Sequence, residues 1–259
     1  MAKLFCVSDI HGFYEEFVMA LNKAGFDRDN PDHWLVTLGD HFDRGHYPLA
    51  VMRFLKCLPR KILIRGNHEQ LLEECCNRGY AESYDYSNGT CRTILELGDA
   101  GEGYEFGECC ARTMAKAHLF LDSMVNYFET RKYIFVHSWI PTINKDGLLP
   151  YHLRNRQFEY NPNWREASQK EWDDAMWGNP WDMVAKGLNQ TNKVLVFGHW
   201  HSSTGWAEAE NRSEFGEDAK FDPYYGDGFI AIDACTAHSR QCNVVVLEDN
   251  FLEESHENS

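Results

Sequence analysis

The stretch Leu38-Gly39-Asp40-His41-Phe42-Asp43-Arg44-Gly45 places two carboxylates and a guanidinium within five residues. It directly follows the apolar run 34–38, which has the character of a short buried strand, and its glycines bracket a tight turn. Ligands of open α/β sheets bind beyond the carboxyl ends of the strands. We therefore expect the functional site to be built around this turn.

The same pattern, an apolar run followed at once by polar residues, occurs four more times along the chain. The apolar runs are 4–6, 61–64, 133–136 and 193–197, and the residues that follow them include Asp9 and His11, Asn67 and His68, His137, and His199. Helical spacing over 13–24 and 48–58 separates the first three runs. This βαβαβ order predicts parallel strands joined by right-handed crossovers.

The later part of the chain has weaker patterns. We expect a helix over 71–77, an excursion of poor periodicity over 79–107, a helix over 109–128, an acidic surface loop over 204–227, and two closing strands at 228–233 and 243–247 that could form a hairpin. The charged tail 253–259 is expected to fray. We predict a single domain over 1–259 with insertions at 75–130 and 141–192.

Composition excludes several classes of partner. The chain has 259 residues and a net charge of -15, which argues against nucleic-acid polymers and anionic membranes as general partners. It contains no run long and apolar enough to span a membrane, and it begins with a strand pattern instead of a signal peptide. An odd count of nine cysteines predicts reduced thiols in a cytoplasmic protein.

The polar residues at the strand ends are oxygen and imidazole donors. Six of them exceed the needs of one tetrahedral zinc but suit two divalent ions, for which we expect Mn, with Fe, Zn or Ni as alternatives: Asp9, His11, Asp40, Asn67, His137 and His199. Asp40, from the middle strand, is the natural bridging carboxylate. A lone histidine is more often a satisfied polar residue, and Asp40 with Asp43 could cap a helix, but the ordered set of six outweighs these readings.

Two ions of this kind can acidify a water and bind two phosphate oxygens, which points to attack in line on phosphorus. His68 stands next to Asn67 and is placed to donate a proton to the leaving oxygen. Asp43 could hold the imidazolium of His68, and Arg44 offers a fork for phosphate oxygens.

These motifs resemble the metallophosphoesterase superfamily, and within it the phosphoprotein phosphatase branch of bacterial and phage Ser/Thr phosphatases. Segments 9–12, 39–45 and 66–69 match the three leading motifs, 136–137 and 198–199 resemble the two later histidine motifs, and 232–233 resembles the closing strand. The resemblance covers about 3–70, 132–140 and 193–247. It implies a calcineurin-like α/β/β/α fold with a two-sheet sandwich flanked by helices, a dinuclear metal centre, and hydrolysis by a metal-bound hydroxide without a covalent intermediate. It also supports the roles given to His68, Asp43 and Arg44.

The chain departs from the family pattern at three places. Ser138-Trp139 follows the fourth motif, so an aromatic side chain is expected at the rim of the site. Trp200 follows His199, which looks more like the symmetrical dinucleoside tetraphosphate hydrolases of the same branch. His201 then completes the Gly-His-x-His pattern of the wider superfamily, and it is either a seventh ligand or a histidine outside the centre.

Arginines beyond Arg44 are harder to assign. The related protein phosphatases place a second phosphate-binding arginine before the fifth motif, but segment 176–180 has none, which leaves Arg154, Arg156 and Arg165 as alternatives. Arg65 is either a phosphate contact, which we favour, or an ion-pair partner, and Asn67 is a further phosphate contact. The tryptophans of 141–192 form either the core of a cap or a platform for a nucleobase.

Together these features predict a cytoplasmic, dinuclear-metal phosphoesterase that acts on phosphomonoesters, either on phosphorylated protein Ser/Thr or on a small molecule. The alternative within enzymes is a symmetrical dinucleoside tetraphosphate hydrolase, favoured by Trp200 and the tryptophan-rich insertion. A third alternative is a non-catalytic phosphate-recognition or scaffold protein, which the retained His68 and Arg44 disfavour. The oligomeric state is left open.

Overall fold

The computed structural model describes residues 2–145 and 157–249. One sheet has the strand order β11-β1-β2-β3. Its members are β1 (Ala2–Val7), β2 (His33–Thr37), β3 (Lys61–Leu63) and β11 (Val245–Asp249). Because β1, β2 and β3 are parallel, the expected βαβαβ unit is confirmed, and β11 closes the sheet antiparallel to β1.

The second sheet has the order β4-β5-β8-β10-β9. Its members are β4 (Tyr127–Glu129), β5 (Tyr133–Val136), β8 (Val194–Phe197), β9 (Tyr224–Gly226) and β10 (Phe229–Ala231). The three central strands β5, β8 and β10 run parallel, and the two outer strands run antiparallel to their neighbours.

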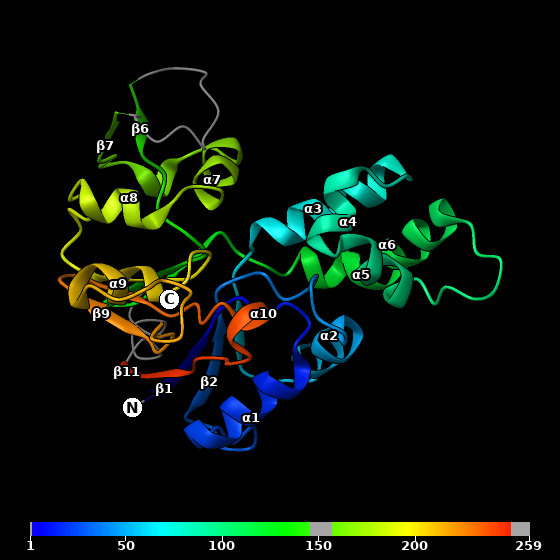
Figure 1. The fold of residues 1–259 in the computed structure, drawn as a ribbon, viewed down its shortest axis with the longest axis horizontal. Helices are drawn as coiled ribbons and strands as arrows, with labels where there is room; N and C mark the ends of the chain where they lie inside the picture. The colour runs from blue at the N-terminus through cyan, green and yellow to red at the C-terminus, as the bar shows by residue number, and fades with distance from the viewer. Residues whose placement is uncertain (1, 146–156, 250–259) are drawn as a thin grey trace, which may run out of the picture.

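The two sheets pack face to face around an apolar layer that includes Leu4, Val36, Phe135, Val196 and Ile230. Burial of these alternating side chains on both inner faces is what holds a sandwich together. Helices cover the outer faces, so the predicted fold class, a two-sheet sandwich flanked by helices, is confirmed (Figure 1).

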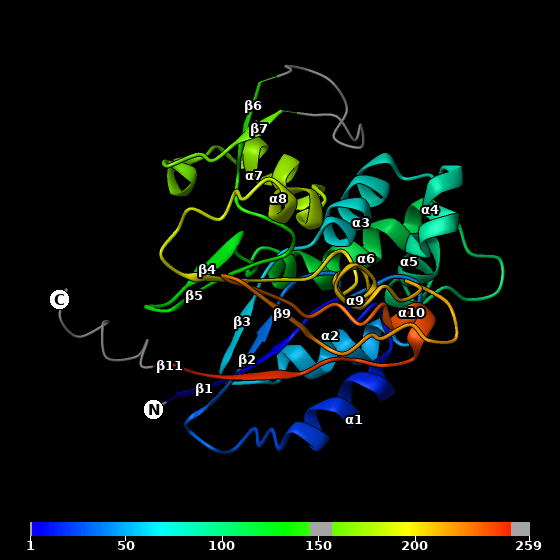
Figure 2. The same cartoon turned by 60° about the vertical axis from the view of Figure 1, so that its left-hand side comes forward.

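Helices α1 (Tyr14–Ala24) and α2 (Pro48–Lys56) pack on the outer face of the first sheet. They are continued by a helical lobe of α3 (Asn67–Arg78), α4 (Ser83–Asn88), α5 (Thr90–Leu97) and α6 (Phe106–Leu121), which shares their apolar core. On the other side, α7 (Gln169–Met176) and α8 (Pro180–Ala185) cover the second sheet beside the small pair β6 (Ile143–Asn144) and β7 (Phe158–Glu159) (Figure 2).

Several expectations for the weakly patterned segments are wrong. The excursion 79–107 contains the two short helices α4 and α5, whose six and eight residues are too few to show a clear period. The helix expected to reach residue 128 ends at Leu121, and residues 127–129 join the second sheet as β4. The acidic loop 204–227 begins as helix α9 (Ser203–Glu210) and ends in β9.

The two closing strands do not form a hairpin. Strand β10 joins the second sheet and β11 joins the first, and the short helix α10 (Thr236–Ser239) lies between them. The charged tail 253–259 lies outside the described residues.

Four tryptophans form the core under α7 and α8: Trp139, Trp164, Trp172 and Trp181. Trp164 stands in a 3₁₀ turn (Trp164–Glu166). Trp139 is buried in this core, so it does not line the rim of the site as expected. Three of the four tryptophans of residues 141–192 are thus buried in this core, and Trp177 is the exposed exception. The division of the chain into one domain with two insertions stays a prediction.

All nine cysteines lie among the described residues, and each is a free thiol. Within residues 2–145 and 157–249, no helix combines the length and the apolar character that crossing a membrane requires.

Candidate metal centre

The loops that follow β1, β2, β3, β5 and β8 converge at one edge of the sandwich. Backbone hydrogen bonds tie them together: His11 donates to the carbonyl of Asp40 (2.8 Å), and Gly198 donates to that of His137 (2.8 Å). Gly39 has φ +93°, and a Cβ at this position would collide with Gly66 and the His137 ring. The glycines of the motifs thus permit the close approach of three loops.

Asp40 lies at the centre of the converging loops. Its Oδ2 is 3.6 Å from Nε2 of His11, and its Oδ1 is 3.4 Å from Nε2 of His137. Around these oxygens, ligand atoms form two buried or nearly buried groups, one of His11, Asp40 and His68 and the other of Asp40, His137 and His199. Each carboxylate oxygen therefore faces a different set of nitrogen donors, as a bridging ligand would.

The imidazoles of His11 and His137 are oriented by backbone carbonyls. Nδ1 of His11 donates to the carbonyl of Phe42 (3.0 Å), and Nδ1 of His137 donates to that of Leu38 (2.6 Å). Because a carbonyl can only accept, each Nδ1 carries a proton, and in the neutral ring the lone pair is then on Nε2, which faces the centre. This tautomer is the one that can bind a metal ion through Nε2.

The backbone of these residues is strained in the same way. Six non-glycine residues at the site have φ between +49° and +69°: Asp9, His11, Asp40, Asp43, Arg44 and His199. This left-handed conformation is unfavourable for residues with a Cβ and tends to persist where function requires it.

The pKa values of the buried carboxylates and imidazoles at the centre fit the binding of cations. Burial, reinforced by the Asp40 carboxylate, raises the pKa of Asp9 to about 6. Burial and the nearby Asp9 raise the pKa of Asp233 well above its usual value. Burial also keeps the pKa of His11 and His199 well below the usual value for histidine, so both imidazoles are neutral. Mutually repelling buried carboxylates beside neutral imidazoles fit divalent ions with mixed nitrogen and oxygen ligands.

The other predicted ligands differ in position. Asn67 begins α3, and its Oδ1 is 2.9 Å from Nε2 of His137, inside the centre. Oδ2 of Asp9 accepts the backbone N–H of His199 (2.9 Å), while its Oδ1 is 3.9 Å from Nε2 of His11. His201 belongs to neither group, and its Nδ1 lies 2.9 Å from Oγ of Ser203.

His68, Asp43 and Arg44 form a connected set at the edge of the centre. Nδ1 of His68 lies 2.8 Å from Oδ2 of Asp43, and its Nε2 lies 3.2 Å from Nη2 of Arg44 and 3.8 Å from Oδ2 of Asp40. Burial lowers the pKa of His68, but the carboxylates of Asp40 and Asp43 outweigh this effect, and the pKa is raised overall.

Asp43 is itself held by the helical lobe. Thr90 donates through Oγ1 to Oδ2 of Asp43 (2.7 Å), and Thr93 donates to Oδ1 (2.7 Å) and lies within hydrogen-bonding distance of the Asp43 N–H (3.0 Å). The turn before α5 approaches so closely that a Cβ on Gly89 would collide with the backbone nitrogen of Arg44.

Glu69 joins the second and third loops. It is fully buried, and its Oε2 accepts the N–H groups of Gly66 (2.8 Å) and Asp40 (3.0 Å). Its Oε1 accepts the backbone N–H of His41 (2.9 Å) and lies 3.1 Å from Nδ1 of the same residue. The carboxylate thus fixes the turn that carries Asp40, and it does not point into the centre.

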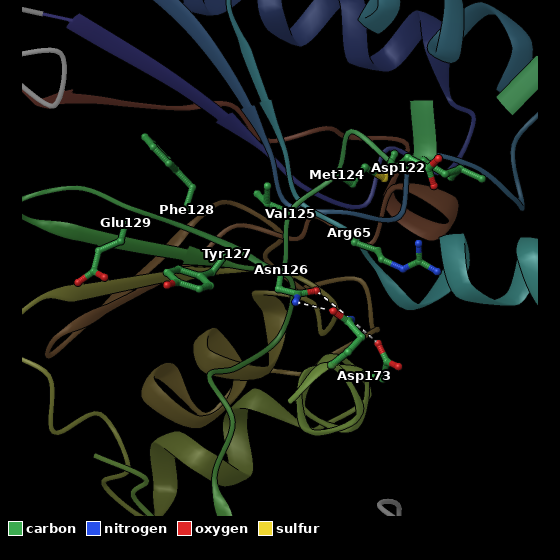
Figure 3. Close-up of a pocket in the computed structure, with 11 residues that line it drawn as sticks. Arg65, Asp122, Met124, Val125, Asn126, Tyr127, Phe128, Glu129 and Asp173 are labelled. Atoms are coloured by element: carbon green, nitrogen blue, oxygen red, sulfur yellow. Dashed lines mark hydrogen bonds between the residues drawn. The ribbon is translucent and has the colours of Figure 1, made fainter. Parts of the chain in front are cut away.

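Of the other arginines considered from the sequence, Arg65 and Arg165 lie among the described residues, and both form ion pairs. Arg65 forms an ion pair with Glu73 and lines a hollow of about 820 Å³ that also contains Asp122, Glu129 and Asp173 (Figure 3). This geometry matches the ion-pair alternative, and its phosphate role stays a prediction. Arg165 pairs with Glu129 (2.6 Å) on the surface. Arg154 and Arg156 lie outside the described residues.

Sequence reasoning missed Thr90, Thr93 and Asp233. The two threonines lie in the segment that lacked a clear pattern, and an i, i+3 pair of hydroxyls has no distinctive signature. Asp233 was noted only as part of the closing strand, although it follows an apolar run as the ligands do.

Comparison with known proteins was consistent with this geometry. Residues 2–203 match the family of calcineurin-like phosphoesterases. The symmetrical bis(5'-nucleosyl)-tetraphosphatase of Glaesserella parasuis serovar 5 (strain SH0165) is 38% identical over 66 residues, which span 25% of this chain and only 24% of that relative. The protein of the same name from Hamiltonella defensa subsp. Acyrthosiphon pisum (strain 5AT) is 22% identical over 246 residues, 80% of this chain and 86% of that relative.

Among solved structures, a point mutant of a cold-active protein tyrosine phosphatase superposes with a TM-score of 0.55. The superposition covers 96% of this chain and 76% of that one, at 16% identity. At this level of identity the likeness is one of fold.

Proposed function

Because the chain belongs to the calcineurin-like phosphoesterase family and is therefore a hydrolase, we propose that its centre cleaves phosphomonoesters, on phosphorylated protein Ser/Thr or on a small molecule. The observation that carries this proposal is the position of Asp40, whose two oxygens face two different groups of nitrogen donors. A bridging carboxylate between two ions is the arrangement that phosphoryl hydrolysis uses.

The residues that would hold the two ions are Asp9, His11, Asp40, Asn67, His137 and His199, and we propose manganese as the metal. When bound, the ions would supply Lewis acidity toward the phosphate oxygens and the attacking water. The tautomers of His11 and His137 leave both Nε2 lone pairs available for this role.

Proton transfer falls to His68 in this proposal. Its Nε2 faces the centre and would donate to the leaving oxygen, while Asp43 accepts the hydrogen bond of Nδ1 and keeps the ring oriented. Arg44, 3.2 Å from the same Nε2, would bind equatorial phosphate oxygens through its guanidinium.

A second candidate is the hydrolysis of dinucleoside tetraphosphates. Two exposed tryptophans are connected to His199 through the backbone: Trp200 follows it in sequence, and the backbone of Trp177 forms a hydrogen bond with His199. They are 36% and 40% exposed, whereas the other tryptophans of the insertion are buried. Exposed aromatic faces at the mouth of a site are suited to stacking on a base, and both curated relatives above carry the name of such a hydrolase.

The proposal is tested by loading EDTA-treated protein with Mn²⁺ and following hydrolysis of a phosphoserine peptide and of diadenosine tetraphosphate. Phosphate release from the peptide supports the first candidate, and formation of two ADP supports the second. Absence of turnover on both substrates, or full activity in EDTA, would refute the proposed chemistry.

The proton-donor role has its own test. His68→Asn is expected to lower kcat much more for an alkyl phosphate than for p-nitrophenyl phosphate, whose leaving group needs no proton. His118→Asn, an exposed histidine of α6, is the matched control. Equal losses on both substrates would show that His68 does not act as the acid.

A further inference from the structure

The C-terminal end of helix α7 is attached to helix α3 by a side-chain hydrogen bond. Nε1 of Trp177, the residue that caps α7, donates to Oε1 of Gln70 (2.9 Å). Gln70 lies in the first turn of α3, two positions after His68 and three after Asn67, which begins the helix. Trp177 therefore connects α7, which covers the second sheet, to the turn that carries two residues of the centre.

The backbone of Trp177 is in contact with the centre itself, through His199. Burial lowers the pKa of His199 and the hydrogen bond with the backbone of Trp177 partly raises it, so the Trp177 carbonyl accepts this bond from the imidazole. Nδ1 of His199 lies 3.2 Å from Nε2 of His137 and thus faces the centre, which leaves Nε2 to donate to the carbonyl. His199 is thereby held in the tautomer whose Nδ1 lone pair is available to a metal ion.

The groups that face Nδ1 of His199 are themselves acceptors. In the neutral ring of His137 the lone pair is on Nε2, because Nδ1 donates to the carbonyl of Leu38, and Oδ1 of Asp40 lies 3.4 Å from that Nε2. Acceptors that converge in this way repel one another unless a cation lies between them. His199 therefore needs a partner outside the centre that keeps its ring in place, and the Trp177 carbonyl is such a partner.

The segment that carries this carbonyl is fixed on both sides of the peptide chain. On one side, Oγ of the buried Ser138 donates to the carbonyl of Gly178 (2.7 Å), the residue after Trp177. On the other side stands the indole of Trp177, which burial holds less firmly than the other tryptophans of the segment because it is 40% exposed. Its hydrogen bond to Gln70 is thus the specific contact that fixes the indole.

We propose that Trp177 is a positioning residue for the metal centre: its carbonyl keeps Nδ1 of His199 directed at the ion, and its indole, anchored on Gln70, keeps that carbonyl in place. The inference rests on the proposed function, because it takes His199 to be a metal ligand. It makes Gln70, which contacts no ligand of the centre through its side chain, a determinant of the affinity for one of the two ions. Changes to groups that orient ligand imidazoles typically cost about 10–100-fold in metal affinity.

The test measures Mn²⁺ binding to the metal-free full chain by calorimetric titration. Gln70→Leu and Trp177→Phe each remove one side of the hydrogen bond, and each should raise the Kd of one of the two ions by about fivefold or more. The double variant should bind no more weakly than the weaker single variant, because both changes break the same bond. Gln169→Leu is the matched control, since Gln169 lies at the other end of α7 and exchanges hydrogen bonds with Asn126 (3.0 and 3.2 Å), away from His199. It loosens the same helix and should leave both Kd values unchanged.

Nitrogen NMR of the imidazole rings in the metal-free protein gives a second readout, with His199 assigned through a His199→Gln variant. His199 should carry its proton on Nε2 in the wild type, and Gln70→Leu should mix the two tautomers. If Mn²⁺ binds and Gln70→Leu changes both Kd values no more than Gln169→Leu does, Trp177 has only a structural role and the proposal is overturned. If the wild type binds no Mn²⁺ but the tautomer of His199 still depends on Gln70, the proposed function fails and the positioning of His199 by Trp177 stands.

Discussion

Glu69→Gln tests the idea that one buried carboxylate fixes the turn that carries Asp40. In the wild type, Oε2 accepts two backbone N–H groups, and Oε1 accepts the N–H of His41. The glutamine amide keeps the shape of the side chain and one acceptor oxygen, but its NH₂ group replaces the other oxygen and faces groups that themselves donate hydrogen bonds. If the amide oxygen replaces Oε2, the NH₂ group faces the backbone N–H and the Nδ1 of His41, and both of these hydrogen bonds are lost. Each lost hydrogen bond to a charged group is worth about 1.5–3 kcal/mol, so two lost bonds predict a loss of about 3–6 kcal/mol in the free energy of unfolding.

Titration of the same group gives an independent magnitude. Burial alone would raise the pKa of Glu69, but the nearby His41 and the backbone donors lower it from 4.5 to about 2. This difference corresponds to about 3 kcal/mol of stability. Because the pKa is depressed in the folded state, the contribution is complete above pH 4.5 and is lost as the pH falls toward 2.

Urea unfolding followed by circular dichroism at pH 7 and at pH 4 measures both effects. We expect Glu69→Gln to be less stable than wild type by at least 3 kcal/mol at pH 7 and the difference to shrink at pH 4. Glu74→Gln, on the exposed face of the same helix, should change stability by less than about 0.5 kcal/mol. A Glu69→Gln protein within 1 kcal/mol of wild type at pH 7 would refute the reasoning.

Three further predictions concern the lobe and the metal. The double variant Thr90→Val and Thr93→Val removes the hydroxyl hydrogen bonds to Asp43, so kcat for an alkyl phosphate should fall about tenfold or more in steady-state assays. Gly89→Ala combines φ +89° with a collision at Arg44, so thermal unfolding should show a loss well above 1 kcal/mol. Removal of metal by EDTA should lower the melting temperature, and Mn²⁺ at about 100 times its Kd should restore about 2.7 kcal/mol.

A control variant or a contradicting result can be named for each of these three predictions. Gly79→Ala, at φ +75° with no atom near the added methyl group, isolates the backbone cost, and equal losses at Gly79 and Gly89 would deny the contact with Arg44. Unchanged kcat in the threonine double variant would mean that Asp43 keeps its position without the lobe. A melting temperature insensitive to EDTA would argue against ions bound at the strand ends.

Features that depend on the pattern within one short segment could be predicted from the sequence, and pairings between distant segments could not. The parallel unit β1, β2 and β3 was predictable, because strand patterns alternate there with two clearly periodic helices. The polar residues at its strand ends do lie together, since parallel strands deliver their carboxyl ends to one edge. In contrast, the pairing of β11 with β1 joins residues more than 230 positions apart, and nothing in the local pattern of residues 243–247 distinguishes it from a hairpin with β10.

Side-chain partners were less predictable than positions. The pairing of His68 with Asp43 was expected. The two threonines that hold Asp43 come from α5, and this helix was not predicted because its eight residues are too few to show a clear periodic pattern. Arg65 was favoured as a phosphate contact because of its place in a motif. Its ion pair with Glu73 depends instead on the first two turns of α3, which bring that carboxylate next to the arginine. Such contacts follow from packing, which a motif does not encode.

The contact between α5 and the second loop also bears on how this protein could have evolved and how it can be engineered. Inserted segments are usually treated as modules that can be gained, lost or exchanged without harm to the scaffold. Here the hydroxyls of Thr90 and Thr93 donate hydrogen bonds to Asp43, and Gly89 leaves the space that the backbone of Arg44 occupies. Part of the lobe therefore positions residues of the reaction centre. A gene-shuffling library that exchanges this segment between relatives should therefore yield active chimeras only where both hydroxyls and the glycine are inherited together with it.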